Sequence, residues 1–179
     1  MYQLLGNYPE RVGLKLRRGL YFTDINEDFP QAIKAYIQAL QFAAQEQMHP
    51  LSDEVIGIKI ELVRCLEKAN NPKNAIEVCE SMKKDCMDWI REHGEEEGMR
   101  PMRTSLLGWA CKIGTRLGDL YASPYVANAE KSEENLVWAV ETNIKERQRR
   151  EKEGVREGEG DWLDHDEFGS QLECTVFCC

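Results

Sequence analysis

The chain has 179 residues, of which 42% are hydrophobic and 31% are charged, a composition typical of a folded domain rather than a disordered segment. Its formal net charge of −9 argues against nucleic acid as the main partner, because phosphate binding needs a basic surface. Residues 35–45 form the longest stretch without a charged side chain, well short of the about 20 apolar residues that cross a bilayer.

Six segments show the 3.6-residue periodicity of amphipathic helices, and no segment indicates a strand. The predicted helices cover residues 9–24, 30–47, 53–69, 72–93, 102–121 and 132–153. Turn residues support these limits: Pro30 and Pro72 suit the first turn of a helix, and Asn71 suits an N-cap. Ser52 and Asp53 are alternative caps for the third helix. The chain is therefore predicted to be all-α.

Apolar and small residues at helical spacing mark one face of each predicted helix as the inner face. In chain order, these residues are Val12, Leu16, Gly19 and Leu20; Ala32, Ile33, Tyr36, Ala39, Leu40 and Ala43; Val55, Ile58, Leu62, Val63 and Leu66; Ile76, Cys79, Met82 and Trp89; Leu106, Trp109, Ile113 and Leu117; and Leu136, Ala139, Val140 and Ile144. Residues 145–153 are almost all charged, and we expect them to project into solvent.

The order of the predicted helices divides the chain into three parts. Residues 1–153 form three helical hairpins, and residues 154–161 form a charged linker rich in Gly and Glu. Because Val155 is its only apolar residue, we expect the linker to be poorly ordered. Residues 162–179 begin a further hairpin and end in an irregular Cys-rich tail. The second helix of that hairpin is missing, so we expect the chain to stop inside a longer array.

The cysteines do not predict disulfides. They are Cys65, Cys79, Cys86, Cys111, Cys174, Cys178 and Cys179, an odd number at irregular spacing. Seven residues along one helix separate Cys79 and Cys86 by about 10 Å, whereas a disulfide needs Cα atoms within about 7 Å. We expect buried thiols that pack as small apolar residues. There is no Cys-x2-Cys pair, and the three histidines stand apart, so no metal site is predicted.

Paired helices with short connections suggest a repeat. Seven residues carry a pattern at the spacing of the tetratricopeptide repeat: Leu117, Gly118 and Tyr121 for its first helix, Ala32, Tyr36 and Ala39 for its second, and Ala75 in a weaker copy. Asn135 and Ala139 form another weak copy. Small residues let two helices approach closely, and an aromatic ring fills the groove beside them. The pattern predicts an α-solenoid, a right-handed stack of antiparallel helical hairpins with insertions between repeats. An unrelated helical bundle is the alternative.

Longer motifs narrow this resemblance. They are Tyr8-Pro9-Glu10; Leu16-Arg17-Arg18-Gly19-Leu20-Tyr21-Phe22-Thr23; Ala32-Ile33-Lys34-Ala35-Tyr36; Leu117-Gly118-Asp119-Leu120-Tyr121; and the stretch from Glu130 through Trp138-Ala139-Val140-Glu141-Thr142. In this order, they resemble the tetratricopeptide-repeat adaptor subunit of the mitochondrial inner-membrane i-AAA protease complex in fungi. The likeness covers about residues 8–173.

The resemblance implies a protein that an N-terminal helix holds in the mitochondrial inner membrane, with its repeats facing the intermembrane space. It implies an adaptor that binds unfolded membrane-protein substrates and helps deliver them to the protease. The implied partners are the i-AAA protease complex and unfolded polypeptides. Residues 1–9 contain neither this anchor nor a signal peptide, and residues 174–179 stand where the family continues into further repeats. We therefore expect the anchor to lie outside this chain, which we interpret as truncated.

The predicted activity is protein binding, not catalysis. No nucleophile supported by histidine, Gly-rich phosphate loop or cofactor motif is recognisable, so no catalytic, cofactor-binding or metal residues are assigned. First helices line the concave groove of such stacks, which makes the candidate groove residues Leu16, Tyr21, Leu62, Leu66, Arg116, Leu117 and Tyr121. Most of these positions suit the core equally well. A clamp of Lys and Asn for chaperone C-termini is disfavoured, because apolar residues occupy the corresponding face. A cytosolic co-chaperone or scaffold of the same fold remains the alternative function.

Overall fold

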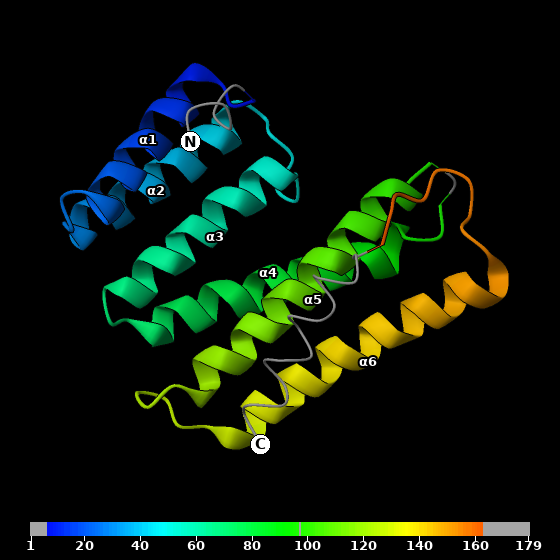
Figure 1. Cartoon of the computed structure of the whole chain (residues 1–179). Helices are drawn as coiled ribbons and strands as arrows, with labels where there is room; N and C mark the ends of the chain where they lie inside the picture. Colours follow the sequence, from blue (N-terminus) through cyan, green and yellow to red (C-terminus); the bar gives the residue numbers. More distant parts are fainter. Residues whose placement is uncertain (1–6, 97, 163–179) are drawn as a thin grey trace. The chain divides into compact units, whose positions relative to one another are not determined.

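The computed structural model describes residues 7–96 and 98–162. These residues form helices and turns, with no strand among them. The helices are α1 (Glu10–Asp24), α2 (Phe29–Gln45), α3 (Asp53–Lys68), α4 (Pro72–His93), α5 (Arg100–Ala122) and α6 (Ala129–Glu153), shown in Figure 1. The predicted all-α fold is confirmed, and the helix limits lie close to those expected from periodicity. The further hairpin predicted after residue 162 lies outside the described residues.

The chain divides into two compact units, Met1–Val78 and Cys79–Cys179, and α4 runs through the boundary between them. The first unit contains α1, α2, α3 and the start of α4. The second contains the rest of α4 with α5 and α6. None of the helices within the described ranges is both long enough and apolar enough to cross a membrane.

In the first unit, a glycine brings α1 and α2 into close contact, and α3 packs on both helices. A Cβ atom at Gly19 would lie 2.7–2.9 Å from carbons of the Tyr36 ring, so only glycine lets that ring approach α1 so closely. The Tyr36 side chain is fully buried, and its hydroxyl oxygen lies 3.2 Å from that of Thr23. Burial raises the pKa of Tyr36 to about 12, so the phenol remains a neutral hydrogen-bonding group.

Side-chain caps mark the starts of four helices; at α4 the cap is Asn71, as predicted, and its side-chain oxygen accepts a backbone N–H bond of 3.5 Å from the first turn. Asp28 accepts a hydrogen bond from a backbone N–H in the first turn of α2 at 3.2 Å, and Asn128 does so for α6 at 3.0 Å. At the start of α3, Ser52 rather than Asp53 is the cap, because the Ser52 Oγ accepts the backbone N–H bond, at 3.3 Å. Each cap satisfies a donor that the helix leaves unpaired.

The second unit joins α5 and α6 in a similar way. A Cβ atom at Gly118 would lie 2.5 Å from Cγ of Leu136, so glycine again allows the close approach. The Ser132 hydroxyl donates a hydrogen bond of 2.8 Å to the Gly118 carbonyl oxygen. Ser132, rather than Asn135, is therefore the small residue that faces α5. The weak repeat copy predicted at Asn135 is out of register with the packing.

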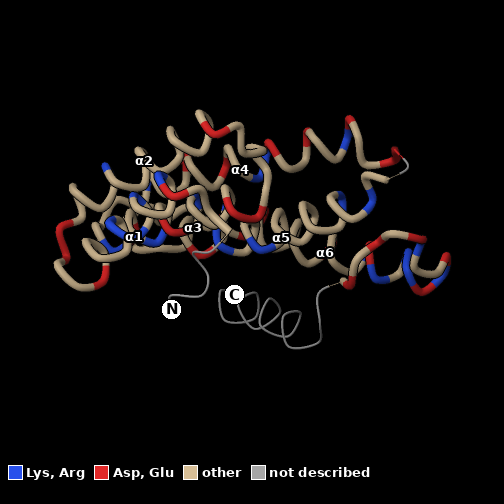
Figure 2. Tube along the Cα trace, turned by 90° about the horizontal axis from the view of Figure 1, so that it is seen from above, with Lys and Arg blue, Asp and Glu red and all other residues tan. Residues whose placement is uncertain are grey.

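The C-terminal half of α6 projects into solvent only in part: Lys145 and residues 151–153 are exposed, as predicted for residues 145–153, but Glu146 is buried. The Glu146 side chain is only 4% exposed, and its carboxylate pairs with Arg103 at 3.2 Å, Arg149 at 2.6 Å and Arg150 at 3.0 Å. Figure 2 shows acidic and basic residues close together along these last turns. The prediction was wrong for Glu146, because long charged side chains can cover apolar surface while they neutralise one another.

Residues 154–162, predicted to be a poorly ordered linker, make several polar contacts with α5 and α6. The Glu159 side chain is 1% exposed and accepts a hydrogen bond from Arg149 at 2.7 Å. The Trp162 indole N–H donates a bond of 2.9 Å to the side-chain oxygen of Asn143. These polar contacts replace the apolar burial that the linker lacks. Asn143 is consequently fully buried, whereas Ile144, predicted to point inward, is 38% exposed.

Candidate functional site

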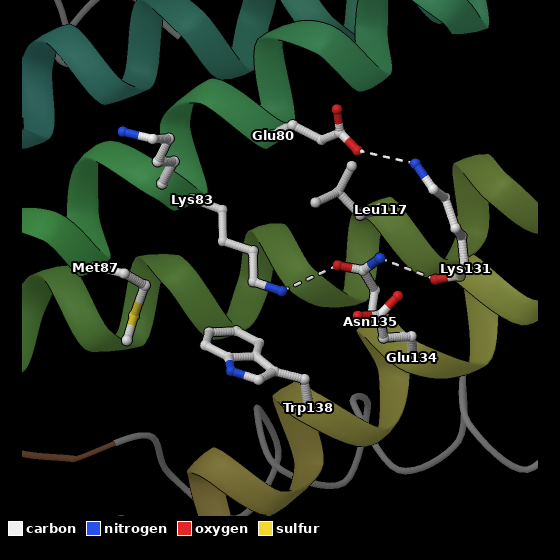
Figure 3. Close-up of a pocket in the computed structure, with 9 residues that line it drawn as sticks. Glu80, Lys83, Met87, Leu117, Lys131, Glu134, Asn135 and Trp138 are labelled. Atoms are coloured by element: carbon white, nitrogen blue, oxygen red, sulfur yellow. Dashed lines mark hydrogen bonds and ion pairs between the residues drawn. The ribbon is translucent and has the colours of Figure 1, made fainter.

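A cavity of about 590 Å³ opens in the second unit between α4 and α6 (Figure 3). Its lining residues are Glu80, Lys83, Lys84 and Met87 from α4; Leu117 from α5; and Lys131, Glu134, Asn135 and Trp138 from α6. On each of α4 and α6, the four residues follow the spacing i, i+3, i+4, i+7, which places them along one helical face. Two matching stripes of charged, amide and apolar side chains thus form the walls of this α4–α6 groove.

A second glycine of α5 positions the aromatic wall of the groove. A Cβ atom at Gly114 would lie 3.1 Å from carbons of the Trp138 ring, so the indole rests directly on the α5 backbone. Leu117, which is almost fully buried, also lines the cavity. Trp138 remains half-buried and faces Lys83 in Figure 3. The helix spacing therefore holds an aromatic face open to the groove.

Lys83 is the central charged group of the groove. Its Nζ lies 3.7 Å from the centroid of the Trp138 ring and donates a hydrogen bond of 3.0 Å to the side-chain oxygen of Asn135. Both of these direct contacts are to neutral groups. Burial lowers the pKa of Lys83, and the carboxylates of Glu134 and Glu80 oppose that shift. The ammonium group therefore pays a desolvation cost without a carboxylate in hydrogen-bonding contact.

The neighbouring cations differ from Lys83 because each already contacts a carboxylate. The Nζ of Lys131 lies 3.8 Å from Glu80 and 3.2 Å from the hydroxyl oxygen of Tyr121. That hydroxyl donates a short hydrogen bond to Glu80. Lys84 pairs with Asp88 on α4 at 2.6 Å. Lys83 is thus the groove cation best placed to receive an external anion.

The groove residues predicted from the sequence are mostly not the residues that line the α4–α6 groove. Leu16, Leu62, Leu66, Leu117 and Tyr121 are buried, while Tyr21 is 51% exposed and Arg116 is exposed. Of these candidates, only Leu117 lines the cavity. Tyr121 does not line it but donates a hydrogen bond to Glu80, which does. The residues of the repeat-packing signature, Ala32, Tyr36, Ala39, Ala75, Leu117, Gly118 and Tyr121, are all buried.

The buried cluster around Glu146 is a second group of charges, and its contacts are internal. Arg149 bridges Glu146 and Glu159, and Arg150 donates hydrogen bonds to the Gly160 carbonyl oxygen at 2.9 Å and to the Thr104 hydroxyl at 3.3 Å. Three arginines hold the pKa of Glu146 down at about 2 despite its burial. Because the carboxylates of Glu146 and Glu159 are paired with arginines of the cluster itself, this cluster has a structural role, and the α4–α6 groove is the better candidate site.

The histidines and cysteines of the described residues lie outside the α4–α6 groove. His49 Nδ1 lies 3.2 Å from the backbone nitrogen of Leu51, and His93 pairs with Glu96 at 2.9 Å. Cys65 and Cys111 are buried free thiols, and burial raises the pKa of Cys111 to about 12. Within the described part of the chain, no three His, Cys, Asp or Glu side chains are arranged to hold a metal ion.

The α4 stripe was visible in the sequence but was not recognised as a site. Lys83 and Lys84 read as ordinary solvated positions, because periodicity alone does not reveal which helix lies opposite. Comparisons with family models, with curated proteins and with solved structures give no match for this chain.

Proposed function

We propose that this chain is a protein-binding adaptor built from tetratricopeptide-like helical hairpins, which holds extended polypeptide in the α4–α6 groove. Following the resemblance of its motifs, we further propose that it presents unfolded or membrane-protein substrates to the mitochondrial i-AAA protease. Its place would then be the inner membrane, facing the intermembrane space, through an anchor outside this chain. The second candidate, a cytosolic co-chaperone or scaffold, becomes an outcome of the experiments.

One observation carries the proposal of hairpin repeats: the same buried spacing recurs on α2, α4 and α6. The residues at positions i, i+4 and i+7 are Ala32, Tyr36 and Ala39; Ala75, Cys79 and Met82; and Ser132, Leu136 and Ala139, all at most 4% exposed. On α1 and α5, a glycine faces the middle residue of the paired helix. Such repetition on alternate helices supports a solenoid-type scaffold, and scaffolds of this type bind extended partners on their surfaces.

The groove supplies the binding surface for this function. Its volume falls within the about 300–1,000 Å³ typical of ligand sites, which suits a few side chains rather than a folded domain. Met87 and Trp138 offer adaptable apolar contact, and Lys83 and Asn135 offer polar contact. A mixed surface of this kind suits binding to many sequences.

Binding is tested with a fluorescein-labelled polypeptide that is kept unfolded by reduction and carboxymethylation. Fluorescence anisotropy should show saturable binding, while the native form of the same polypeptide should not bind. Trp138→Ala should weaken binding about tenfold, because an aromatic contact is lost. Val137→Ala, a change at an exposed neighbour outside the groove, is the matched control. Absence of binding to the unfolded form would refute the adaptor function.

The partner is tested separately by affinity purification of the chain from a mitochondrial detergent extract. Co-purification of the i-AAA protease subunit supports the mitochondrial proposal. Recovery of a cytosolic chaperone from whole-cell extract, without the protease, would instead favour the co-chaperone.

A further inference from the structure

We propose that the α4–α6 groove selects peptide segments in which an isolated Asp or Glu stands beside an apolar residue, with the peptide carboxylate pairing with Lys83. This inference rests on the proposed function, since it names the chemistry of the polypeptide that the adaptor prefers. The occupant is a partner segment of low negative charge density.

The Lys83 ammonium has more N–H donors than its contacts in the groove use. A lysine ammonium has three N–H donors and no acceptor, and Asn135 takes one of them. The Trp138 ring faces the ammonium at 3.7 Å and stabilises its charge without accepting a conventional hydrogen bond. A donor is therefore left for the groove. A ligand carboxylate would complete the set, and charge-assisted bonds are about twice as strong as neutral ones.

Lys83 is the cation of the groove at which an external anion meets the least competition. Lys131 is engaged by Glu80 and Tyr121, and Lys84 by Asp88, so an incoming anion at either position competes with an existing partner. At Lys83 there is no such competition, because its direct partners are Asn135 and Trp138. A single ligand carboxylate would give Lys83 the anionic partner that it does not have within the groove.

The other residues that line the groove determine what can accompany the carboxylate of the ligand. Met87, Leu117 and Trp138 give the groove apolar surface, which suits an apolar side chain next to the acidic one. Glu80 and Glu134 also line the groove, and their charges disfavour a dense array of negative groups. A single carboxylate is tolerated there, whereas the phosphate chain of a nucleic acid is not. These contacts thus favour acidic–apolar peptides over polyanions.

The test compares two synthetic labelled peptides on the unaltered chain: Gly-Ser-Leu-Glu-Leu-Ser-Gly and its Gln counterpart, both with blocked termini. Anisotropy should show about tenfold tighter binding of the Glu peptide, because a charge-assisted hydrogen bond is lost with Gln. Because this comparison needs no substitution, it does not depend on how a variant folds. Equal affinity for the two peptides would overturn the inference.

A substitution at Lys83 tests whether this residue contacts the peptide carboxylate. Lys83→Met keeps the length and apolar contact of the side chain but removes its charge, so it should abolish the preference for Glu over Gln. Lys145→Met removes the same charge from an exposed position of α6 outside the groove and should retain the preference. Circular dichroism confirms folding of both variants. A preference that survives in folded Lys83→Met, or one that is lost in Lys145→Met, contradicts the assignment.

Two further outcomes separate the proposals. If the unfolded polypeptide binds but the Glu and Gln peptides bind equally, the adaptor function stands and the carboxylate inference fails. If neither the polypeptide nor the peptides bind, both fail. A labelled single-stranded oligonucleotide should bind more weakly than the Glu peptide, and tighter binding of the oligonucleotide would overturn the choice of a peptide ligand.

Discussion

Each unit links its helices with a cluster of ion pairs, but the two clusters differ in exposure. In the first unit, Asp24 of α1 receives two hydrogen bonds from Arg64 of α3, at 2.7 and 2.9 Å, and one from Lys68 at 2.8 Å. These side chains remain about one third or more exposed. In the second unit, Glu146 is 4% exposed beneath three arginines. An ion pair in the first unit is therefore exposed and contributes little to stability, whereas the buried pairs of the second unit are costly to break.

The largest effect is expected from Glu146→Ala. The substitution removes the carboxylate that Arg103, Arg149 and Arg150 share, although Arg149 keeps its contact with Glu159. Breaking a buried pair in this way costs about 3–5 kcal/mol. Urea denaturation should show a correspondingly lower free energy of unfolding. Glu151→Ala on the exposed face of α6 is the control and should change it by less than about 0.5 kcal/mol. A small effect at Glu146 would remove the contrast between the two clusters.

A pH titration tests the same contrast without changing the arginines. The folded-state pKa of Glu146 is about 2, below its usual 4.5, so its stabilisation is fully present above about pH 5. It is lost as the pH falls from about 5 towards 2, and the shift corresponds to about 3 kcal/mol. Glu146→Gln should flatten this part of the curve of unfolding free energy against pH. An unchanged slope in the variant would assign the acid sensitivity to other carboxylates.

Glycine substitutions test whether the close helix approach at a glycine is equally important for stability in both units. Gly19→Ala and Gly118→Ala should each lower the unfolding free energy by about 1 kcal/mol. Overpacking against Tyr36 or Leu136 costs about 1–3 kcal/mol, which exceeds the gain of about 1 kcal/mol in helix propensity. Gly160→Ala, whose Cβ would meet nothing within 4 Å, is the control. Stabilisation of either variant in thermal denaturation would show that the helices can separate freely.

The smallest effect is expected from Asp24→Asn. An ion pair at this exposure contributes about 1 kcal/mol or less, and salt screens it. The difference in unfolding free energy between the substituted and unaltered chains should shrink further in 1 M NaCl, where the Debye length is about 3 Å. A loss as large as that of Glu146→Ala, unaffected by salt, would mean that exposure does not distinguish the clusters.

Local signals in the sequence predicted the helices well. Pro72 opens α4 as expected, and the limits of α4 agree with the prediction, because proline and cap preferences act over a few residues. The position of Ser132 was missed, since the two residues Asn135 and Ser132 differ by one helical turn and the choice depends on Gly118 of the facing helix. Non-local packing decided that register.

The site was less predictable than the fold for a related reason. Glu146 belongs to a run of charges that reads as solvated, and only the arrangement of Arg103 and residues 154–162 buries it. Lys83 likewise looks like a surface lysine until Trp138 and Asn135 are placed opposite it. Both cases require knowledge of which helices are neighbours, and single-helix periodicity does not contain that information.

The buried thiols provide the chain with built-in reporters of local opening. Cys65 lies in the first unit and Cys111 in the second, and both are shielded from solvent. Burial raises the pKa of each thiol, so the reactive thiolate becomes available only when the surrounding helices separate. Alkylation rates at the two positions, read by mass spectrometry, therefore measure the opening of each unit independently. Matching rates would identify a single cooperative structure, and different rates would rank the two units by kinetic accessibility.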